Sequence, residues 1–292
     1  MLEQLIVNGV VAGAIYSLVA LGFALIYQTS RFFHFAHGGV YTSGAYLAYL
    51  FIVLLRFPFP VGIVCAVLFA SLIGGLIELG IYRPLRRRSA SSSVLLLASL
   101  GILIVMQNFI SMFFGDDSKS IRNAPITEGV SLLNARITSI QITIVAVSWG
   151  LCCLTWAALH FTRGGRIMRA VANDNELSRV VGINSDKTIL ASFILGSALA
   201  AIAAIFIALD TDMVPLMGFH ALLMGVVAVI VGGVGSVPGA LVGGLFIGLV
   251  QHLGVWKLPT QWQDAIIFVM LILLLLLRPQ GFAGKPLRTS SV

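Results

Sequence analysis

The chain has 292 residues, of which 59% are hydrophobic and only 10% are charged, and its mean hydropathy is +1.02. A soluble domain carries about 25% charged residues, so no soluble core could hide this much apolar surface. The composition therefore excludes an ordinary soluble protein and indicates a chain embedded in lipid. The formal net charge of +7 then points to basic cytoplasmic loops rather than to nucleic acid, because Lys and Arg mark such loops in membrane proteins.

Nine apolar runs follow one another along the chain, and each predicts a helix. They lie at about 5–29, 39–55, 60–82, 94–114, 138–161, 188–209, 219–231, 237–252 and 263–277. Most have the ~20 residues that a helix needs to cross ~30 Å of hydrocarbon. The runs on either side of the glycine-rich segment 232–239 are short, so they form either a tight hairpin or one interrupted helix. The sequence predicts an all-α, polytopic transmembrane helix bundle of about eight to nine spans, in a single transmembrane domain over 1–292.

The densest basic cluster, Tyr82-Arg83-Pro84-Leu85-Arg86-Arg87-Arg88, predicts a cytoplasmic loop. Counting spans outward from this cluster places four segments on the same side, and these segments hold most of the 18 Lys and Arg residues. The four segments are 30–38, 83–93, 162–187 and 278–292. We therefore expect the N-terminus outside and the C-terminus in the cytoplasm. Glu78 lies before the basic cluster on the same run, and we expect it to pair there.

The longest of the predicted cytoplasmic loops, 162–187, carries a helical pattern. Four residues recur at helical spacing: Ile167, Ala170, Val171 and Asp174. Gly182 fits the stop at the C-terminal end of a helix. A short amphipathic helix of this kind is too small to fold alone. It is either a docking element for a partner protein or a surface helix that rests on lipid head groups, and the residues alone leave both open.

Four motifs, in the same order along the chain, carry a specific resemblance. They are Phe35-Ala36-His37-Gly38, then Tyr82-Arg83-Pro84-Leu85-Arg86, then Gly165-Arg166-x-x-Arg169-Ala170-x-x-x-Asp174 followed by Gly182-Ile183-Asn184, and last Gly232-Gly233-Val234-Gly235-Ser236-Val237-Pro238-Gly239-Ala240. On these motifs the chain resembles the branched-chain amino acid ABC-transporter permeases of the LivH type. Two positions depart from the family pattern. His34 stands where the family usually has Asn, and Gly39 follows where some members have Glu.

The resemblance implies the permease subunit of a bacterial ABC importer in the inner membrane, which moves small polar solutes such as branched-chain amino acids. It implies two ATPase subunits, a second and similar permease, a periplasmic solute-binding protein and the lipid bilayer as partners. ATP would be bound by the ATPase subunits, and no cofactor, enzymatic activity or nucleic acid is expected for this chain. The residues implied in coupling to the ATPases are Gly165, Arg166, Arg169, Ala170, Asp174 and Gly182.

Two segments are candidates for lining the translocation pathway. They contribute Phe35, His37 and Gly38 after the first span, and Gly233, Gly235 and Pro238 between the late runs. Broken helices in transporters free backbone groups for a substrate, although a simple tight turn fits the glycines equally well. The glycine-rich turn lacks the Gly-Lys-Ser/Thr of a phosphate loop. His34 and His37 have no carboxylate or thiol beside them, so a metal site is not expected.

A function of another class stays open on the residues alone: a stand-alone channel or secondary carrier for urea or short amides. A proton- or sodium-coupled carrier usually places Asp or Glu inside its spans, whereas the acidic residues here fall mostly in loops or at span ends. The sequence contains no phosphate loop, metal motif or Ser-His-Asp set. We therefore do not expect the chain to hydrolyse ATP itself.

Overall fold

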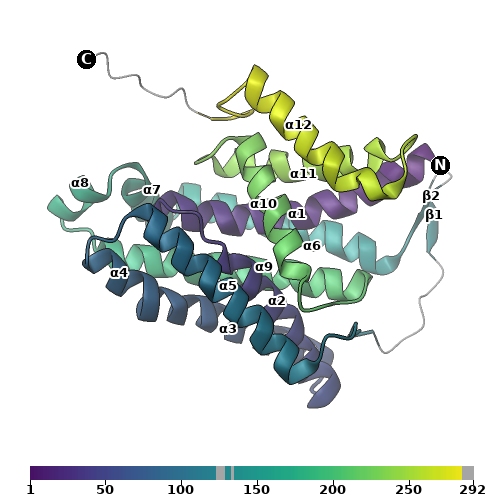
Figure 1. Cartoon of the computed structure of the whole chain (residues 1–292), viewed down its shortest axis with the longest axis horizontal. Helices are drawn as coiled ribbons and strands as arrows, with labels where there is room; N and C mark the ends of the chain where they lie inside the picture. The colour runs from purple at the N-terminus through teal and green to yellow at the C-terminus, as the bar shows by residue number, and fades with distance from the viewer. Residues whose placement is uncertain (123–128, 133–134, 285–292) are drawn as a thin grey trace. The chain divides into compact units, whose positions relative to one another are not determined.

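The computed structural model describes residues 1–122, 129–132 and 135–284, and most of them are helical (Figure 1). All nine apolar runs predicted from the sequence are helices. The nine helices are α1 Leu2–Ser30, α2 Ala36–Tyr49, α3 Phe59–Ile77, α5 Ser92–Phe114, α6 Ser139–Phe161, α9 Ser185–Asp210, α10 Met217–Gly232, α11 Val237–Gly254 and α12 Gln263–Leu277. A π-helical turn, Leu50–Leu54, extends α2, and a second one, Glu78–Tyr82, leads from α3 into the short α4 Arg83–Arg87. A 3-10 turn, Thr260–Trp262, precedes α12. Between α6 and α9 lie α7 Arg163–Asn173 and α8 Asn175–Val180.

Two short strands add to the predicted helical class. β1 Val130–Leu132 and β2 Ala135–Ile137 pair antiparallel, with Val130 opposite Ile137. The strand β2 is joined to the start of α1 by two hydrogen bonds. The Arg136 N–H donates to the side-chain oxygen of Gln4 at 2.8 Å, and the Gln4 amide donates to the Arg136 carbonyl at 3.0 Å. The all-α class is confirmed, and this strand pair is a small feature that hydropathy did not predict.

Seven helices in the described ranges are long and apolar enough to cross a membrane. The expected count of eight to nine spans is therefore slightly too high, because α2 and α10 fall short. The 16 residues of α10 extend only about 24 Å at 1.5 Å per residue, less than the ~30 Å of hydrocarbon. Glycine and hydroxyl residues lower the hydropathy of α2. They suit its position, because α2 is almost entirely buried against α3, α5 and α9.

The contacts of the chain divide it into two compact units. The first unit comprises Met1–Ala24, Ile126–Cys152 and Met224–Val292, and the second comprises Leu25–Pro125 and Cys153–Leu223. Three of the four boundaries fall inside α1, α6 and α10, so each of these three helices contributes to both units. The expectation of a single transmembrane domain over 1–292 stays a prediction.

The first unit is built on the close approach of α1 and α11. A β-carbon at Gly13 would lie 2.9 Å from the Leu245 Cα, and one at Gly248 would collide with the backbone of Gly13. Small residues are what allows helices to associate in lipid, where no hydrophobic effect drives them together. A buried hydrogen bond from the Tyr16 hydroxyl to the Gln251 side-chain oxygen, 2.8 Å long, adds to this contact.

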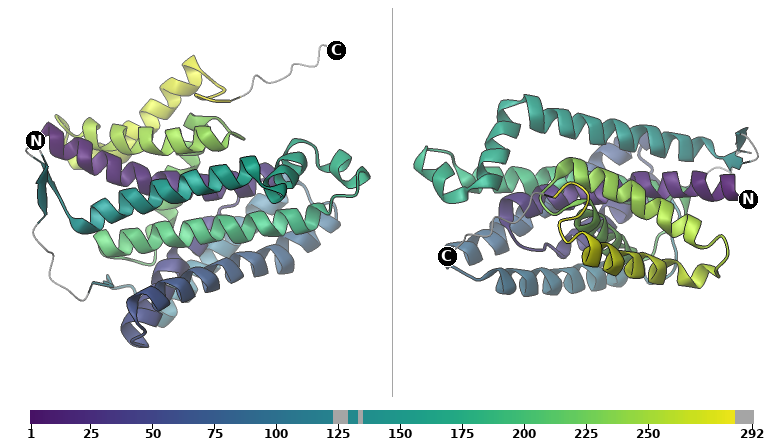
Figure 2. Two further views of the ribbon diagram at one scale, coloured as in Figure 1. Left: turned by 180° about the vertical axis from the view of Figure 1, so that it is seen from behind. Right: turned by 90° about the horizontal axis from the view of Figure 1, so that it is seen from above.

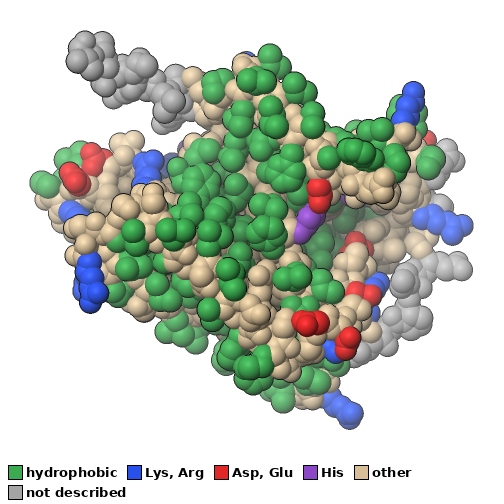
Figure 3. All heavy atoms as spheres, viewed as in Figure 1, with side chains coloured by type: hydrophobic (Ala, Val, Ile, Leu, Met, Phe, Trp, Pro, Cys, Tyr) green, Lys and Arg blue, Asp and Glu red, His purple; other side chains and the backbone are tan. Residues whose placement is uncertain are grey.

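The second unit packs α2, α3, α5 and α9 together, and Figure 2 shows α3 and α9 side by side. A β-carbon at Gly44 would lie 2.6 Å from the Ala201 Cα, so α2 and α9 cross closely. The core of the unit contains Ile26, Phe32, Val40, Ala70, Ile77, Tyr82, Leu95, Ile189, Phe193 and Ala201. Hydrophobic side chains also cover much of the outer face seen in Figure 3, as expected of a surface that meets acyl chains.

Replacing Gly248 with Ala tests the contact between α1 and α11. The added methyl group meets the backbone of Gly13, so we expect a destabilisation of about 1–3 kcal/mol. Gly101→Ala in α5 is the matched control, since a β-carbon there meets nothing within 4 Å. The control should be neutral or slightly stabilising, because Ala favours a helix over Gly. The measurement is the thermal unfolding midpoint of the purified protein in detergent, and equal midpoints for the two variants would contradict the contact.

Candidate functional site

The loop predicted to dock a partner begins with a sharp turn from α6 into α7. The Thr162 hydroxyl accepts a hydrogen bond from the Gly165 N–H at 3.0 Å, which caps the N-terminus of α7. Gly165 is buried against the end of α6, where a β-carbon would collide with the carbonyl oxygen of Leu159. A residue without a side chain is therefore needed at position 165 for this tight turn. The face of α7 that carries Gly165 packs against the end of α6.

Asp174 separates α7 from α8. Its backbone is extended (φ −149°, ψ 111°), and its carboxylate accepts a hydrogen bond from the Leu177 N–H at 2.9 Å. The loop therefore contains two helices, α7 and α8, in place of the one short helix that its spacing indicated. The physical reason is that an Asp side chain competes for nearby backbone N–H groups and favours a helix cap over a helix interior. Gly182, with φ +84°, follows the end of α8 as predicted.

The arginines of α7 have different surroundings. Arg166 is exposed. Arg169 lies against the end of α6, where its guanidinium donates to the His160 carbonyl at 3.3 Å and lies 3.2 Å from His160 Nδ1. Ala170 is half-buried, and α7 packs on α9. Arg169 therefore helps to hold α7 in place, whereas Arg166 is open to a partner.

An apolar patch lies at the end of α8, and we call its members, Leu177, Val180 and Val181, the α8 patch. Their exposed fractions are 60%, 83% and 67%. The patch lies outside the seven helices of membrane-spanning length, in a segment that is otherwise polar. Exposed apolar side chains grouped in this way mark interaction surfaces. These three residues were not predicted from the sequence, although their spacing of three to four residues is typical of one face of a helix and could have indicated them.

An arginine-rich network lies next to α8 and joins the end of α3 to the start of α9. Glu78 is fully buried, and Arg86 donates two hydrogen bonds to its carboxylate, one of them 2.9 Å long. The predicted pairing of Glu78 with the basic cluster is confirmed. Arg83 and Arg87 both contact Asp186, at 3.0 and 3.3 Å. Glu78 begins a π-helical turn, a distortion that often occurs at functional positions.

Three of the four basic segments meet at this end of the second unit. Arg31, which follows α1, donates a hydrogen bond to the Ala172 carbonyl in the last turn of α7. The opposite end of the unit lies beyond the last residues of α5 and α9, where Lys119 and Met213 exchange two backbone hydrogen bonds of 2.9 Å. The segments 30–38, 83–93 and 162–187 thus share one end, as their predicted alternation requires. The fourth segment belongs to the first unit, and its residues 285–292 lie outside the described chain.

The first group of pathway candidates forms the start of α2 in the second unit. The Phe35 N–H donates to the Ser99 hydroxyl at 3.1 Å. His37 is fully buried, and a β-carbon at Gly38 would lie 2.6 Å from the Gly218 carbonyl oxygen. All three residues therefore contribute to packing within this unit. Whether they also line a pathway stays a prediction.

His34, which departs from the family pattern, has a specific partner. Its Nδ1 lies 3.0 Å from the Tyr82 hydroxyl, and the centroid of its ring is 4.9 Å from that of Phe193. Burial lowers the pKa of His34 well below its ordinary value, and the nearby His37 adds to the shift. His34 is therefore neutral at physiological pH, which suits a side chain packed among aromatic rings.

The second group of pathway candidates lies in the first unit, where the glycine-rich segment forms a tight hairpin between α10 and α11. Gly233 and Gly235 have φ values of +106° and +89°, which favour glycine. The Ser236 hydroxyl accepts a hydrogen bond from the Gly239 N–H at 3.1 Å and caps α11. Of the two arrangements left open by the sequence, the structure contains the hairpin and not one interrupted helix.

Residues that follow α12 close over this hairpin. The N–H groups of residues 282–283 donate to the carbonyl oxygens of residues 231–232 at 2.9 Å, which satisfies acceptors at the end of α10. Gly233 is buried beneath this segment, whereas Gly235 and Pro238 are exposed. Of these three candidates, only Gly235 and Pro238 are therefore exposed within the first unit. Their role in a pathway stays a prediction.

Comparisons with known proteins add to this geometry. A family model described as the permease component of branched-chain amino acid transport systems matches residues 5–275. The chain is 33% identical to the high-affinity branched-chain amino acid transport system permease protein LivH of Escherichia coli (strain K12), over 97% of this chain and 96% of that protein. It is also 33% identical, over the same shares, to the corresponding protein BraD of Pseudomonas aeruginosa. The solved structure of PsaBC from Streptococcus pneumoniae in complex with Fab has a TM-score of 0.55 at 10% identity, over 95% of this chain and 92% of that chain, and so shares the fold.

Removing one partner of the Glu78–Arg86 pair should leave a buried charge without compensation. We expect Arg86→Met to destabilise the protein by about 3–5 kcal/mol. The double variant Glu78→Met/Arg86→Met should recover most of this loss, because neither charge then remains. Arg88→Met is the control, since Arg88 is exposed and its replacement should change stability by no more than about 0.5 kcal/mol. Thermal unfolding of the purified variants measures the effect, and strictly additive losses in the double variant would contradict the pairing.

Proposed function

Because the chain belongs to the family of permease components of branched-chain amino acid transport systems, we propose that it is the membrane-spanning subunit of an ATP-driven bacterial importer for branched-chain amino acids. The observation that carries this proposal is the similarity over 97% of the chain to permeases that are named for this transport. The relatives do not favour a channel or a secondary carrier for urea or short amides.

In this proposal the energy comes from partner subunits. Two ATPase subunits bind and hydrolyse ATP, a second and similar permease completes the membrane part, and a periplasmic solute-binding protein delivers the solute. The exposed surface of α7 and α8 supports a partner on that side, because it combines the α8 patch with the open charge of Arg166. An apolar surface with a few charges is suited to seating a short helix in a groove of another protein.

The end of the second unit that holds the arginine-rich network faces the cytoplasm in this proposal, with the bundle in the bacterial inner membrane. The support is the meeting of three basic segments at that end, since Lys and Arg mark cytoplasmic loops. The 29 residues of α1 reach about 43 Å at 1.5 Å per residue, long enough to cross the membrane. Because α1 ends beside this network, the N-terminus lies outside, and the C-terminus is assigned to the cytoplasm from the basic residues that follow α12.

The helices α7 and α8 act as the coupling element. When ATP closes the ATPase subunits, the element moves with them, and its contacts transmit the movement to the spans. Three such contacts are present: Arg31 with the Ala172 carbonyl, Arg169 with His160, and the packing of α7 on α9. They connect α7 to the ends of α1, α6 and α9. A closely packed element of this kind moves as a rigid body rather than bending. A small displacement of α7 is therefore transmitted to all three helices.

Substitutions in α7 and at the start of α8 test the coupling role. Ala170→Trp should overpack the contact with the ATPase, at a cost of about 1–3 kcal/mol, and should abolish uptake while membrane abundance stays normal. Ala170→Ser is its matched control and should transport normally. Asp174→Arg should also reduce uptake. Asp174→Asn keeps a good helix cap for α8 and separates the loss of charge from the loss of the cap.

The measurements are uptake of a branched-chain amino acid by cells with the complete importer and copurification of the ATPase subunits. We expect Ala170→Trp either to copurify poorly or to stay bound while hydrolysis no longer drives uptake. Normal uptake by both Ala170→Trp and Asp174→Arg, at normal abundance, would show that α7 and α8 do not couple the permease to its ATPases.

A further inference from the structure

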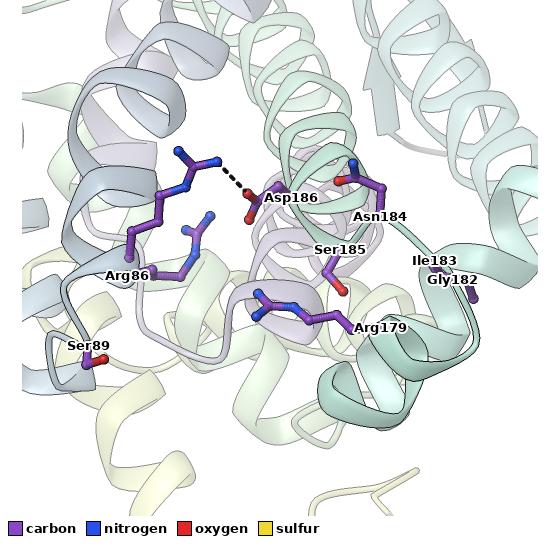
Figure 4. Close-up of a pocket in the computed structure, with 9 residues that line it drawn as sticks. Arg86, Ser89, Arg179, Gly182, Ile183, Asn184, Ser185 and Asp186 are labelled. Atoms are coloured by element: carbon purple, nitrogen blue, oxygen red, sulfur yellow. Dashed lines mark hydrogen bonds and ion pairs between the residues drawn. The ribbon is translucent and has the colours of Figure 1, made fainter.

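A pocket of about 660 Å³ lies between the end of α4 and the start of α9, within the second unit (Figure 4). We call it the α4–α9 pocket. Arg86 and Arg87 line it from α4, Arg179 lines it from α8, and Ser185 and Asp186 line it from the first turn of α9. Two stretches that are distant in sequence, 86–89 and 179–186, thus line one polar space, and neither the family comparison nor the proposed coupling role requires it.

The pocket carries an excess of positive charge. Arg83, Arg86 and Arg87 share the two carboxylates of Glu78 and Asp186. Arg179 adds a further guanidinium and has no ion pair with any residue in the described ranges. Of the charged side chains that line the pocket, the three cations Arg86, Arg87 and Arg179 therefore stand against one anion, Asp186. A guanidinium without a partner beside such a pocket favours an anionic ligand, and its planar set of donors suits phosphate oxygens.

Ser185 provides a second, independent observation. Its residue is only 2% exposed, and its hydroxyl oxygen is buried without a hydrogen-bond partner in the part of the chain that the structure describes. Figure 4 shows Ser185 and Arg179 facing the same hollow. Buried hydroxyl groups are normally satisfied, and leaving one unpaired is costly. Ser185 is also the first residue of α9, where free N–H groups and the helix dipole favour an anion.

The depth of the pocket indicates where the anion comes from. Leu76, Leu79 and Ile81 are exposed apolar side chains on the helix that leads into α4, so this part of the helix meets acyl chains. Arg86 follows Ile81 by five residues, which is about 7 Å along a helix. The head-group layer on each side of the hydrocarbon is itself about 5–7 Å thick. The arginines of the pocket therefore lie at the level of lipid phosphates.

We propose that the α4–α9 pocket binds a phosphate-bearing anion, and that this anion is the head group of an anionic phospholipid. Arg86, Arg87 and Arg179 hold the phosphate oxygens, and the Ser185 hydroxyl donates a hydrogen bond to one of them. Soluble phosphate esters share this chemistry, but the depth of the pocket selects a lipid. A lipid bound here bridges α4, α8 and α9, and so stabilises the segment that carries α7 and α8.

The test is thermal unfolding of the purified full-length protein in neutral detergent, titrated with short-chain phosphatidylglycerol. Phosphatidylcholine with the same acyl chains and soluble glycerol 3-phosphate are titrated in parallel. We expect a saturable rise in the unfolding midpoint with phosphatidylglycerol alone. Arg179→Gln should weaken its apparent affinity about tenfold, since a hydrogen bond to a charged group is lost. Ser185→Ala should weaken it less, and the protein should still fold, because this hydroxyl has no partner within the described chain.

Arg163→Gln is the matched control, because it removes an equal charge from an exposed position of α7 that does not line the pocket. Its affinity for phosphatidylglycerol should equal that of the unsubstituted protein. Equal stabilisation by the two lipids, or unchanged affinity in both Arg179→Gln and Ser185→Ala, would overturn the site. Stabilisation by glycerol 3-phosphate alone, lost in the same variants, would support the phosphate site and overturn its assignment to a lipid.

Discussion

The buried Glu78 carboxylate and the two hydrogen bonds that it accepts from Arg86 fix the end of the second unit. Burying a charge in a helix that lies in lipid costs free energy unless a partner of opposite charge compensates it. The Glu78–Arg86 pair therefore determines the position of α4 relative to the end of α3. With α4 in place, Arg83 and Arg87 reach Asp186 and hold the first turn of α9. That turn supports α8 and completes the α4–α9 pocket. The proposed coupling element and the proposed lipid site therefore depend on one ion pair.

The position of every long helix could be predicted from the sequence, because lipid demands uninterrupted apolar runs whose length is set by the bilayer. The pairing of Glu78 was also predictable, since its partner follows on the same helix. The contact between Arg83 and Asp186 was not, because it joins residues that only the packing of α3 on α9 brings together. The same holds for Arg169, whose bond to His160 depends on the angle at which α7 leaves α6. The spacing that suggested one helix could not reveal that Asp174 would act as a cap.

The glycines in the family-like motifs have structural roles that limit what else they do. Gly165 permits the turn into α7, Gly38 permits the approach of α2 to Gly218, and Gly233 permits the hairpin beneath residues 282–283. Each is needed for close backbone contact, the main way in which helices associate in lipid. Motif matches therefore identified the family, whereas the lining of a pathway by these residues stays a prediction. Beside Arg166, the surfaces that suit partners are formed by side chains outside these motifs, such as those of the α8 patch and Arg179.

In the proposed importer, α7 and α8 face the cytoplasm and are covered by the ATPase subunits. Val180 is the most exposed member of the α8 patch. The variant Val180→Cys therefore tests both the orientation and the contact with the ATPases, provided that Cys65, Cys152 and Cys153 are replaced by Ser. A membrane-impermeant maleimide should label this thiol in inside-out vesicles and not in intact cells, and the assembled ATPase subunits should protect it. Labelling in intact cells would contradict the orientation, and labelling that the ATPase subunits leave unchanged would contradict the coupling site.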